Sequence, residues 1–163
     1  MGRIRFGLSM MKKLLIVSHT PTPNTRVMTN AVVEGASHVE INGIEVIFKQ
    51  PLETGPEEVL DANAVILGTT ENFGYMSGAM KDFFDRIYYP CLEKTESLPF
   101  TVFIRAGNDG LGALSSIEPI TKGLAWRLVQ EPLICRGKWQ PCFVDQCEEL
   151  GMTLAAGLEA GIF

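Results

Sequence analysis

The stretch that decides the fold is Ala64–Arg86, AVILGTTENFGYMSGAMKDFFDR, where an apolar run leads through a glycine-rich loop into a helical pattern. Ala64–Leu67 is short and continuously apolar, which is typical of a strand buried on both faces of a parallel sheet. Four apolar residues then recur at i, i+3, i+4 and i+7 and predict one helix face: Met80, Phe83, Phe84 and Ile87. Ser77 is expected to cap this helix and Pro90 to mark its end.

Four further apolar runs are each followed by a loop or a helical pattern. They predict strands at Leu14–Val17, Ile44–Phe48, Thr101–Ile104 and Leu133–Cys135. Together with Ala64–Leu67 they indicate an α/β domain built on a five-stranded parallel sheet.

The helix after the first strand is predicted from the spacing of its apolar residues. A helix from about Thr25 is expected to pack a small-residue face on the sheet, and its face is Met28, Ala31, Val32 and Gly35. The pair Asn42–Gly43 predicts a turn into the second strand.

The two C-terminal helices follow the fourth and fifth strands. Ser116 is expected to cap the first of them, with Pro119 in its first turn and with Leu124 and Leu128 facing inward. The last helix carries a stripe of period 3.6 that ends near Gly161, and the stripe is Cys147, Leu150, Gly151, Leu154, Ala155 and Leu158.

Length and composition predict a single domain over residues 1–163, with residues 1–11 as a loose leader outside the fold. The chain is 46% hydrophobic and 20% charged, with a net charge of -5. This acidic balance argues against nucleic acid or an anionic membrane as a partner, because phosphate contacts need Lys and Arg.

No apolar run approaches the length of a membrane helix, which is about 20 residues. No signal-peptide core is present either, so we expect a cytoplasmic protein.

The four cysteines, Cys91, Cys135, Cys142 and Cys147, form no C-x-x-C pair, and the chain has only two histidines. This pattern supports neither a zinc site nor a redox dithiol. We expect no metal and reduced, partly buried thiols.

Ligands of such sheets bind beyond the carboxyl ends of the strands, where the strand order reverses. The loop after the first strand, SHTPTPNT, is rich in hydroxyls and leads into a helix N-terminus, which is a ready anion site. Its expected phosphate ligands are Ser18, Thr20, Asn24 and Thr25. The loop has no Lys and no G-x-x-x-x-G-K-[ST] pattern, which argues against an NTPase. An ordinary capped loop remains the alternative.

Two further loops leave the third and fourth strands. Gly68–Gly78 brackets an aromatic residue with glycines, so its backbone and one ring could lie against a flat heterocycle such as a flavin. Packing of Phe73 or Tyr75 on the core is the alternative. Ala106–Gly112 is dominated by Gly, Asn and Asp, and its amides could form a nest for negative charge or a plain turn.

The chain resembles the flavodoxin-like NAD(P)H-dependent FMN reductases and quinone reductases. Members commonly carry G-T-P-x-x-x-G-x-M-S-G-x-[ML]-K-x-F-x-D-R, and this chain reads GTTENFGYMSGAMKDFFDR. The resemblance spans Lys12 to the end and implies a flavodoxin-like three-layer α/β/α sandwich with strand order 2-1-3-4-5. It implies FMN as cofactor, with Ser18, Thr20, Asn24 and Thr25 on the phosphate. Around the ring it places Thr69, Thr70, Glu71, Asn72, Phe73, Gly74, Gly107, Asn108, Asp109 and Gly110.

The chain also departs from the family pattern. Thr70 replaces a usual proline, and Pro21 and Pro23 remove two amide donors from the phosphate loop, which predicts weak FMN binding. Glu71 and Asp109 would lower the reduction potential if their carboxylates lay near the ring.

The function implied is transfer of a hydride from NADH or NADPH to FMN and then to a quinone, azo or flavin acceptor. The cofactor supplies the chemistry, so no catalytic side chain is expected. The alternatives are a flavodoxin-like electron carrier without NAD(P)H activity, and a domain that binds another phosphorylated ligand. The expected partner is a small-molecule acceptor, with a homodimer left open.

Overall fold

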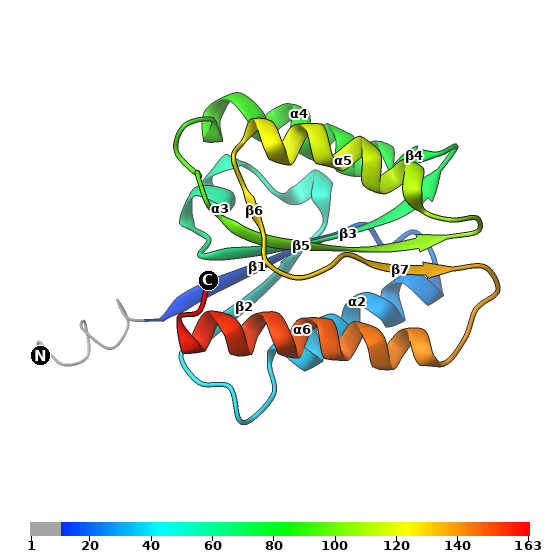
Figure 1. The fold of residues 1–163 in the computed structure, drawn as a ribbon, viewed down its shortest axis with the longest axis horizontal. Coiled ribbons are helices and arrows are strands. Elements are labelled where there is room, and N and C mark those ends of the chain that lie inside the picture. Colours follow the sequence, from blue (N-terminus) through cyan, green and yellow to red (C-terminus); the bar gives the residue numbers. More distant parts are fainter. Residues whose placement is uncertain (1–10) are drawn as a thin grey trace, which may run out of the picture.

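The computed structural model describes residues 11–163, and most of the predicted leader, residues 1–10, lies outside this range. The strands are β1 (Lys12–Ser18), β2 (Ile44–Lys49), β3 (Ala64–Asn72), β4 (Tyr75–Met76), β5 (Pro99–Ala106), β6 (Arg127–Leu128) and β7 (Leu133–Arg136). The helices are α2 (Pro23–Ala36), the 3-10 turn η1 (Pro51–Glu53), α3 (Pro56–Asp61), α4 (Gly78–Cys91), α5 (Leu111–Gly123) and α6 (Cys142–Ala160). Figure 1 shows these elements in one ribbon.

The sheet is parallel except for β4, and its order is β2-β1-β3-β5, with β6 and β7 both paired to β5. The predicted order 2-1-3-4-5 and the fold class are confirmed, because β6 and β7 are two pieces of one edge strand. The predicted count of five is wrong, since residues 11–163 contain seven strands. Pro132 has no amide hydrogen for the ladder and lies where the edge strand is interrupted. The two-residue β4 folds back antiparallel on the end of β3.

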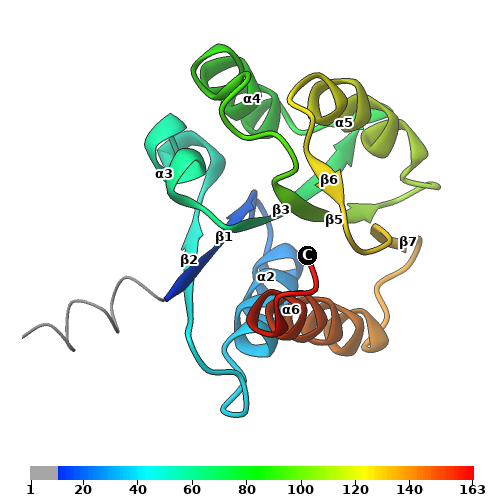
Figure 2. The same ribbon diagram turned by 60° about the vertical axis from the view of Figure 1, so that its left-hand side comes forward.

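The sheet is covered on both faces. In Figures 1 and 2, α3, α4 and α5 lie on one side of it, and α2 and α6 lie on the other. Each face has its own buried cluster, one around Phe83 and Phe84 of α4 and one around Met28 of α2 and Leu154 of α6. This arrangement explains why the strands are continuously apolar. Along Leu14–Val17, successive side chains alternate between the two clusters, so every residue is buried.

Helices α2 and α6 cross at two glycines. A Cβ on Gly35 would overlap the carbonyl oxygen of Glu148, and a Cβ on Gly151 would overlap that of Val32. The predicted inward face of α2 is confirmed as buried. Gly35 at its end packs on α6 as well, which the spacing did not predict.

Helix α4 is confirmed, with its predicted apolar face buried. Ser77 caps it by accepting a hydrogen bond from the Met80 amide at 3.1 Å. Pro90 lies inside the last turn and does not end the helix, which continues to Cys91. A proline near the C-terminus keeps a helical φ and removes only one hydrogen bond, so the turn survives.

Helix α5 begins at Leu111, so the predicted cap at Ser116 is wrong. Gly110, in the left-handed region at φ 73°, starts the helix directly after the β5 loop. Pro119 therefore lies in the helix interior. Leu124 is buried as predicted, but Leu128 is 49% exposed because it belongs to the edge strand β6.

Candidate functional site

Three loops leave the same edge of the sheet. Ser18, the last residue of β1, is in register with Gly68 of β3, and Gly68 is in register with Phe103 of β5. Because parallel strands run in one direction, the segments after these residues emerge side by side. The predicted convergence of the three loops is therefore present in the fold.

Direct contacts join each loop to the next. The His19 amide donates to the Gly68 carbonyl at 3.0 Å, which ties the first loop to the second. A Cβ on Gly68 would overlap the Ser18 hydroxyl, so only glycine permits this approach. A Cβ on Gly112 would overlap the carbonyl of Gly74, which brings the second loop against the start of α5.

Several hydroxyls of the first loop form hydrogen bonds within the protein. Thr22 is the N-cap of α2 and forms a capping box with Thr25, whose hydroxyl donates to the Thr22 carbonyl at 2.9 Å. The Ser18 hydroxyl is buried and paired with that of Thr29 at 2.8 Å. These contacts position the helix N-terminus, which is itself an anion site.

Thr20 and Asn24 keep hydrogen-bond capacity for a ligand. The Thr20 hydroxyl accepts from the side-chain amide Nε2 of Gln50 at 2.5 Å, so its own hydrogen remains to donate. Asn24 is exposed at the first turn of α2, next to the capped end. The neutral donors available for a phosphate are therefore these two side chains and the backbone amide of Asn24, because Pro23 has no N–H and the Thr25 amide donates to Thr22.

The second loop forms a tight hairpin at the end of β3. Asn72 pairs with Tyr75 across a turn in which Phe73 and Gly74 both have positive φ, 54° and 70°. The Phe73 side chain is fully exposed and Tyr75 is 42% exposed, so neither packs in the core as the alternative interpretation required. Thr69 lies buried below, where its hydroxyl accepts from the Ser77 amide at 3.0 Å.

The two carboxylates of the site cap helix α5. A Glu71 carboxylate oxygen accepts from the Ala113 amide at 3.0 Å, and an Asp109 carboxylate oxygen accepts from the Leu111 amide at 3.0 Å. A negative charge at a helix N-terminus is favourable, because the free amides there carry a partial positive charge. Both carboxylates therefore face a positive partner, which weakens the field they would exert on a ring.

Thr70 carries a buried hydroxyl without a hydrogen-bond partner among residues 11–163. It is in register with Arg105 and lies on the same sheet face as Gly68, two residues before it. An unpaired buried hydroxyl costs free energy, so this atom is a candidate ligand contact.

Arg105 lies at the end of β5 and was not predicted as a site residue. Its guanidinium donates to the carbonyls of Ala106, Cys135 and Gly137 at 2.7, 3.0 and 2.7 Å. It also lies 5.3 Å from the ring centroid of Phe143. A charged residue next to a buried strand was the one sequence feature that could have identified it.

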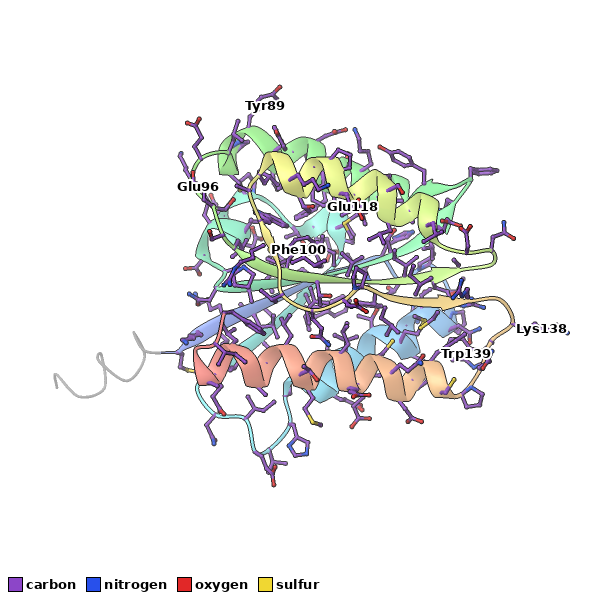
Figure 3. The ribbon with its side chains drawn as sticks, in the orientation of Figure 1. Tyr89, Glu96, Phe100, Glu118, Lys138 and Trp139 are labelled. Carbon is purple, nitrogen blue, oxygen red and sulfur yellow. The ribbon has the colours of Figure 1, made fainter. Side chains whose placement is uncertain are left out.

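The Arg105 cation also faces Trp139, whose ring centroid lies 6.0 Å from it. Figure 3 labels Trp139 in the loop between β7 and α6, at the end of the molecule where the parallel strands end. None of the four salt bridges within residues 11–163 involves Arg105. A positive charge without a carboxylate partner thus borders the candidate site.

His19 is partly buried in the first loop, and burial lowers the pKa of its imidazole below the ordinary value of 6.5. Burial disfavours the charged form, so His19 is neutral at pH 7. Within residues 11–163, no group of three or more His, Cys, Asp or Glu side chains could hold a metal ion. Over the same residues, no helix has the length and apolarity to cross a bilayer.

Comparison with known proteins points to one fold. No family model matches the chain. A flavodoxin of Aquifex aeolicus (strain VF5) is 40% identical over 77 residues, which are 47% of this chain and 40% of that protein. The chain is thus similar to it over less than half of either sequence.

Solved structures match over nearly the whole chain. A flavodoxin from the domain Archaea gives a TM-score of 0.71 at 18% identity, covering 91% of this chain and 99% of that chain. A flavodoxin, WrbA-like protein from Agrobacterium tumefaciens gives 0.72 at 16% identity, covering 92% and 98%. The fold is the flavodoxin fold. The narrower resemblance to NAD(P)H-dependent FMN reductases stays a prediction.

Within this flavodoxin fold, the predicted site residues divide into two groups. The exposed or half-buried residues at the shared edge are Thr20, Asn24, Asn72, Phe73, Gly74, Gly107 and Asn108. Thr70 is grouped with them because its hydroxyl, although buried, has no partner among residues 11–163. The residues whose polar or backbone groups already serve the fold are Ser18, Thr25, Thr69, Glu71, Asp109 and Gly110. The second group holds the loops of this edge in place, and contacts of the first group with a ligand stay a prediction.

Proposed function

We propose that this chain binds FMN at the shared loop edge and is an FMN-dependent oxidoreductase. In this proposal NADH or NADPH reduces the flavin, and a quinone, azo compound or second flavin accepts the electrons. The observation that carries it is the buried, unpartnered hydroxyl of Thr70, located between the hydroxyl-rich loop and Arg105. An acceptor-rich planar cofactor with a phosphate fits a site that offers neutral donors and one positive charge.

The residues of the chain have separate tasks in this proposal. The backbone amide of Asn24 at the N-terminus of α2, with the side chains of Thr20 and Asn24, holds the phosphate by the helix dipole and neutral donors. The hairpin around Gly74 and the open backbone at Gly107 border the ring. When bound, FMN supplies the redox chemistry, so the protein needs only to bind and orient it.

Arg105 and the two caps set the electrostatics of this edge. The guanidinium favours added negative charge on a bound ligand, while Glu71 and Asp109 oppose it less strongly because helix α5 partly neutralises them. We therefore expect the two carboxylates to lower the reduction potential less than their charges alone suggest.

Anaerobic mixing tests the enzyme activity. The protein is loaded with FMN, the excess is removed, and NADH or NADPH is added while the visible absorbance of the flavin is followed. Bleaching within seconds to minutes by either nucleotide is the expected result. Flavin that is bleached by dithionite and by neither nucleotide would contradict an NAD(P)H-dependent reductase.

A second candidate is a flavodoxin-like electron carrier without NAD(P)H activity. It is favoured by the similarity to the Aquifex aeolicus flavodoxin and to the archaeal flavodoxin structure. The same experiment separates the two candidates. A carrier would bind FMN and be reduced only when a separate reductase is added.

A further inference from the structure

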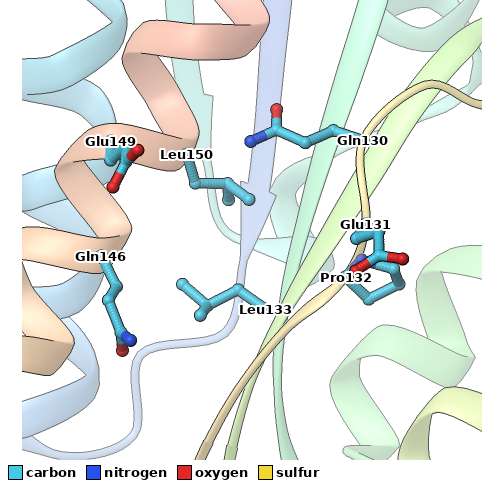
Figure 4. A pocket seen from close by; sticks show the side chains of 7 residues that line it. All are labelled: Gln130, Glu131, Pro132, Leu133, Gln146, Glu149 and Leu150. Carbon is cyan, nitrogen blue, oxygen red and sulfur yellow. The ribbon is translucent and has the colours of Figure 1, made fainter.

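A furrow runs between α6 and the edge segment, residues 129–132, which joins β6 to β7. Its outer hollow has a volume of about 260 Å³ and is shown in Figure 4, with Glu131 of the edge segment and Glu149 of α6 among its lining residues. Its inner hollow, of about 560 Å³, lies nearer the C-terminus. Gln130 lines both hollows, so we treat them as one feature, the edge furrow.

The inner hollow has mainly apolar walls. The chain turns back at Gly161, which is in the left-handed region at φ 71°, and a Cβ on Gly157 would overlap the ring of Phe163. The absence of a side chain at Gly157 thus lets the C-terminal tail form one wall. The apolar side chains of the walls are Val129, Met152, Ala156, Ile162 and Phe163. An apolar hollow of this size can hold the body of a small organic ligand.

Gln130 places a hydrogen-bond acceptor where the two hollows meet. Its backbone is held by the Thr101 hydroxyl, which donates to the Gln130 carbonyl at 2.9 Å. Figure 4 shows its side chain extending from the edge segment towards α6. The side-chain Oε1 is buried and has no hydrogen-bond partner among residues 11–163. A buried acceptor without a partner costs free energy, so a ligand that donates a hydrogen bond here would offset that cost.

The outer hollow is negatively charged. Glu131 and Glu149 are exposed, and neither takes part in a salt bridge within residues 11–163. Asp145 and Glu148 lie next to Glu149 around a neighbouring hollow of α6. Among the described residues, no Lys or Arg lines either hollow of the furrow. The carboxylates therefore favour a cation at this end of the furrow.

We propose that the edge furrow binds a small organic amine, with its apolar body in the inner hollow and its ammonium group in the outer one. An ammonium group carries three donors and a positive charge. It can donate to the Oε1 of Gln130 and is attracted by Glu131 and Glu149, whereas a neutral ligand of the same shape lacks the attraction. None of the residues that line the furrow belongs to the three loops of the candidate site, so this proposal does not depend on FMN.

The first test is a calorimetric titration of the full chain with phenylbutylamine, with the amide chemical shifts followed by NMR. We expect saturable binding with a dissociation constant below about 1 mM, and shift changes at Gln130, Thr153 and Phe163. Phenylbutanol, which has the same apolar body and no charge, should bind at least about tenfold more weakly.

Variants of the two hollows separate charge from shape. Glu149→Gln should weaken amine binding about threefold, and the double variant with Glu131→Gln about tenfold, with no effect on the alcohol. Ala156→Trp, at an exposed position of α6, fills the inner hollow and should abolish binding of both ligands. Glu118→Gln, which removes an exposed carboxylate on α5 across the sheet, is the matched control and should leave both affinities unchanged.

Salt dependence of the unmodified chain keeps the proposal falsifiable if a variant is unstable. Raising NaCl from about 50 mM to about 1 M should weaken amine binding at least about threefold and should not weaken binding of the alcohol. Amine binding that does not saturate by about 10 mM would overturn the proposal. So would an amine that binds no more tightly than the alcohol, or one whose affinity is the same in the double variant and in the unmodified chain.

Discussion

Thr70 shows how a single side chain can report a binding site. Its hydroxyl is buried on the sheet face next to the first loop and has no hydrogen-bond partner in residues 11–163. A protein gains no stability from such a group, and replacing it with a methyl group is close to neutral or stabilising. The hydroxyl therefore has a cost in the free chain that a ligand contact would offset.

Thr70→Val tests this role. We expect the free energy of unfolding without FMN to be unchanged or slightly higher, while FMN binds about three- to tenfold more weakly because one hydrogen bond is lost. Thermal melts and FMN titrations measure the two effects. Thr70→Ser keeps the hydroxyl and is the control. A Val variant that loses stability but binds FMN normally would show that the hydroxyl has a structural role.

His19, in the first loop, makes the stability of the folded protein depend on pH. Its pKa is lowered in the folded protein by burial, so the unfolded chain takes up a proton at a higher pH than the folded chain does. The folded state is therefore destabilised as the pH falls below about 6.5. We expect His19→Gln to flatten the dependence of the urea midpoint on pH between 7.5 and 5.5. Equal slopes for the variant and the wild type would contradict the assignment.

At the scale of elements, the crossing of α2 and α6 positions the first loop. α2 begins in that loop, and its angle to the sheet depends on the close approach of Gly35 and Gly151 to opposing carbonyls. Any side chain at these positions pushes the helices apart. The small residues of this crossing thus connect packing to the geometry of the candidate site.

Gly151→Ala measures this coupling. A methyl group there meets the backbone of Val32, so we expect a loss of about 1–3 kcal/mol in the free energy of unfolding. FMN should also bind more weakly, because the N-terminus of α2 shifts. Gly78→Ala, in α4 with open space around its Cβ, is the control and should be neutral or stabilising. An unchanged urea midpoint for Gly151→Ala would show that the helices can separate freely.

Some elements could be predicted from the sequence because one local pattern fixes them. The period of Met80 to Ile87 and the cap Ser77 give α4, and the stripe of α6 ends at Gly161, which is in the left-handed region. The start of α5 could not be predicted in this way. Asp109 lies just before the helix, but the second cap, Glu71, is separated by 42 residues from the Ala113 amide that it caps, and only the fold brings it to this helix end.

At the scale of the whole molecule, the sequence predicted which loops share one edge of the sheet but not which of their polar groups are free. The positions of the loops follow from strand order alone, and this part is confirmed by the sheet. Whether the hydroxyl of Ser18 faces a ligand or Thr29 depends on packing between β1 and α2, which spacing does not encode. Arg105 was missed for the same reason, because its partners are backbone carbonyls of a distant strand.

The central claim is that three loops of one sheet edge form a site for FMN, and a titration tests it most directly. Purified, flavin-free protein is added to FMN and, in parallel, to riboflavin, while flavin fluorescence is recorded. We predict saturation at one FMN per chain and at least about tenfold weaker binding of riboflavin, which lacks the phosphate held by α2. FMN fluorescence that stays unchanged at saturating protein, or equal binding of both flavins, would contradict the account.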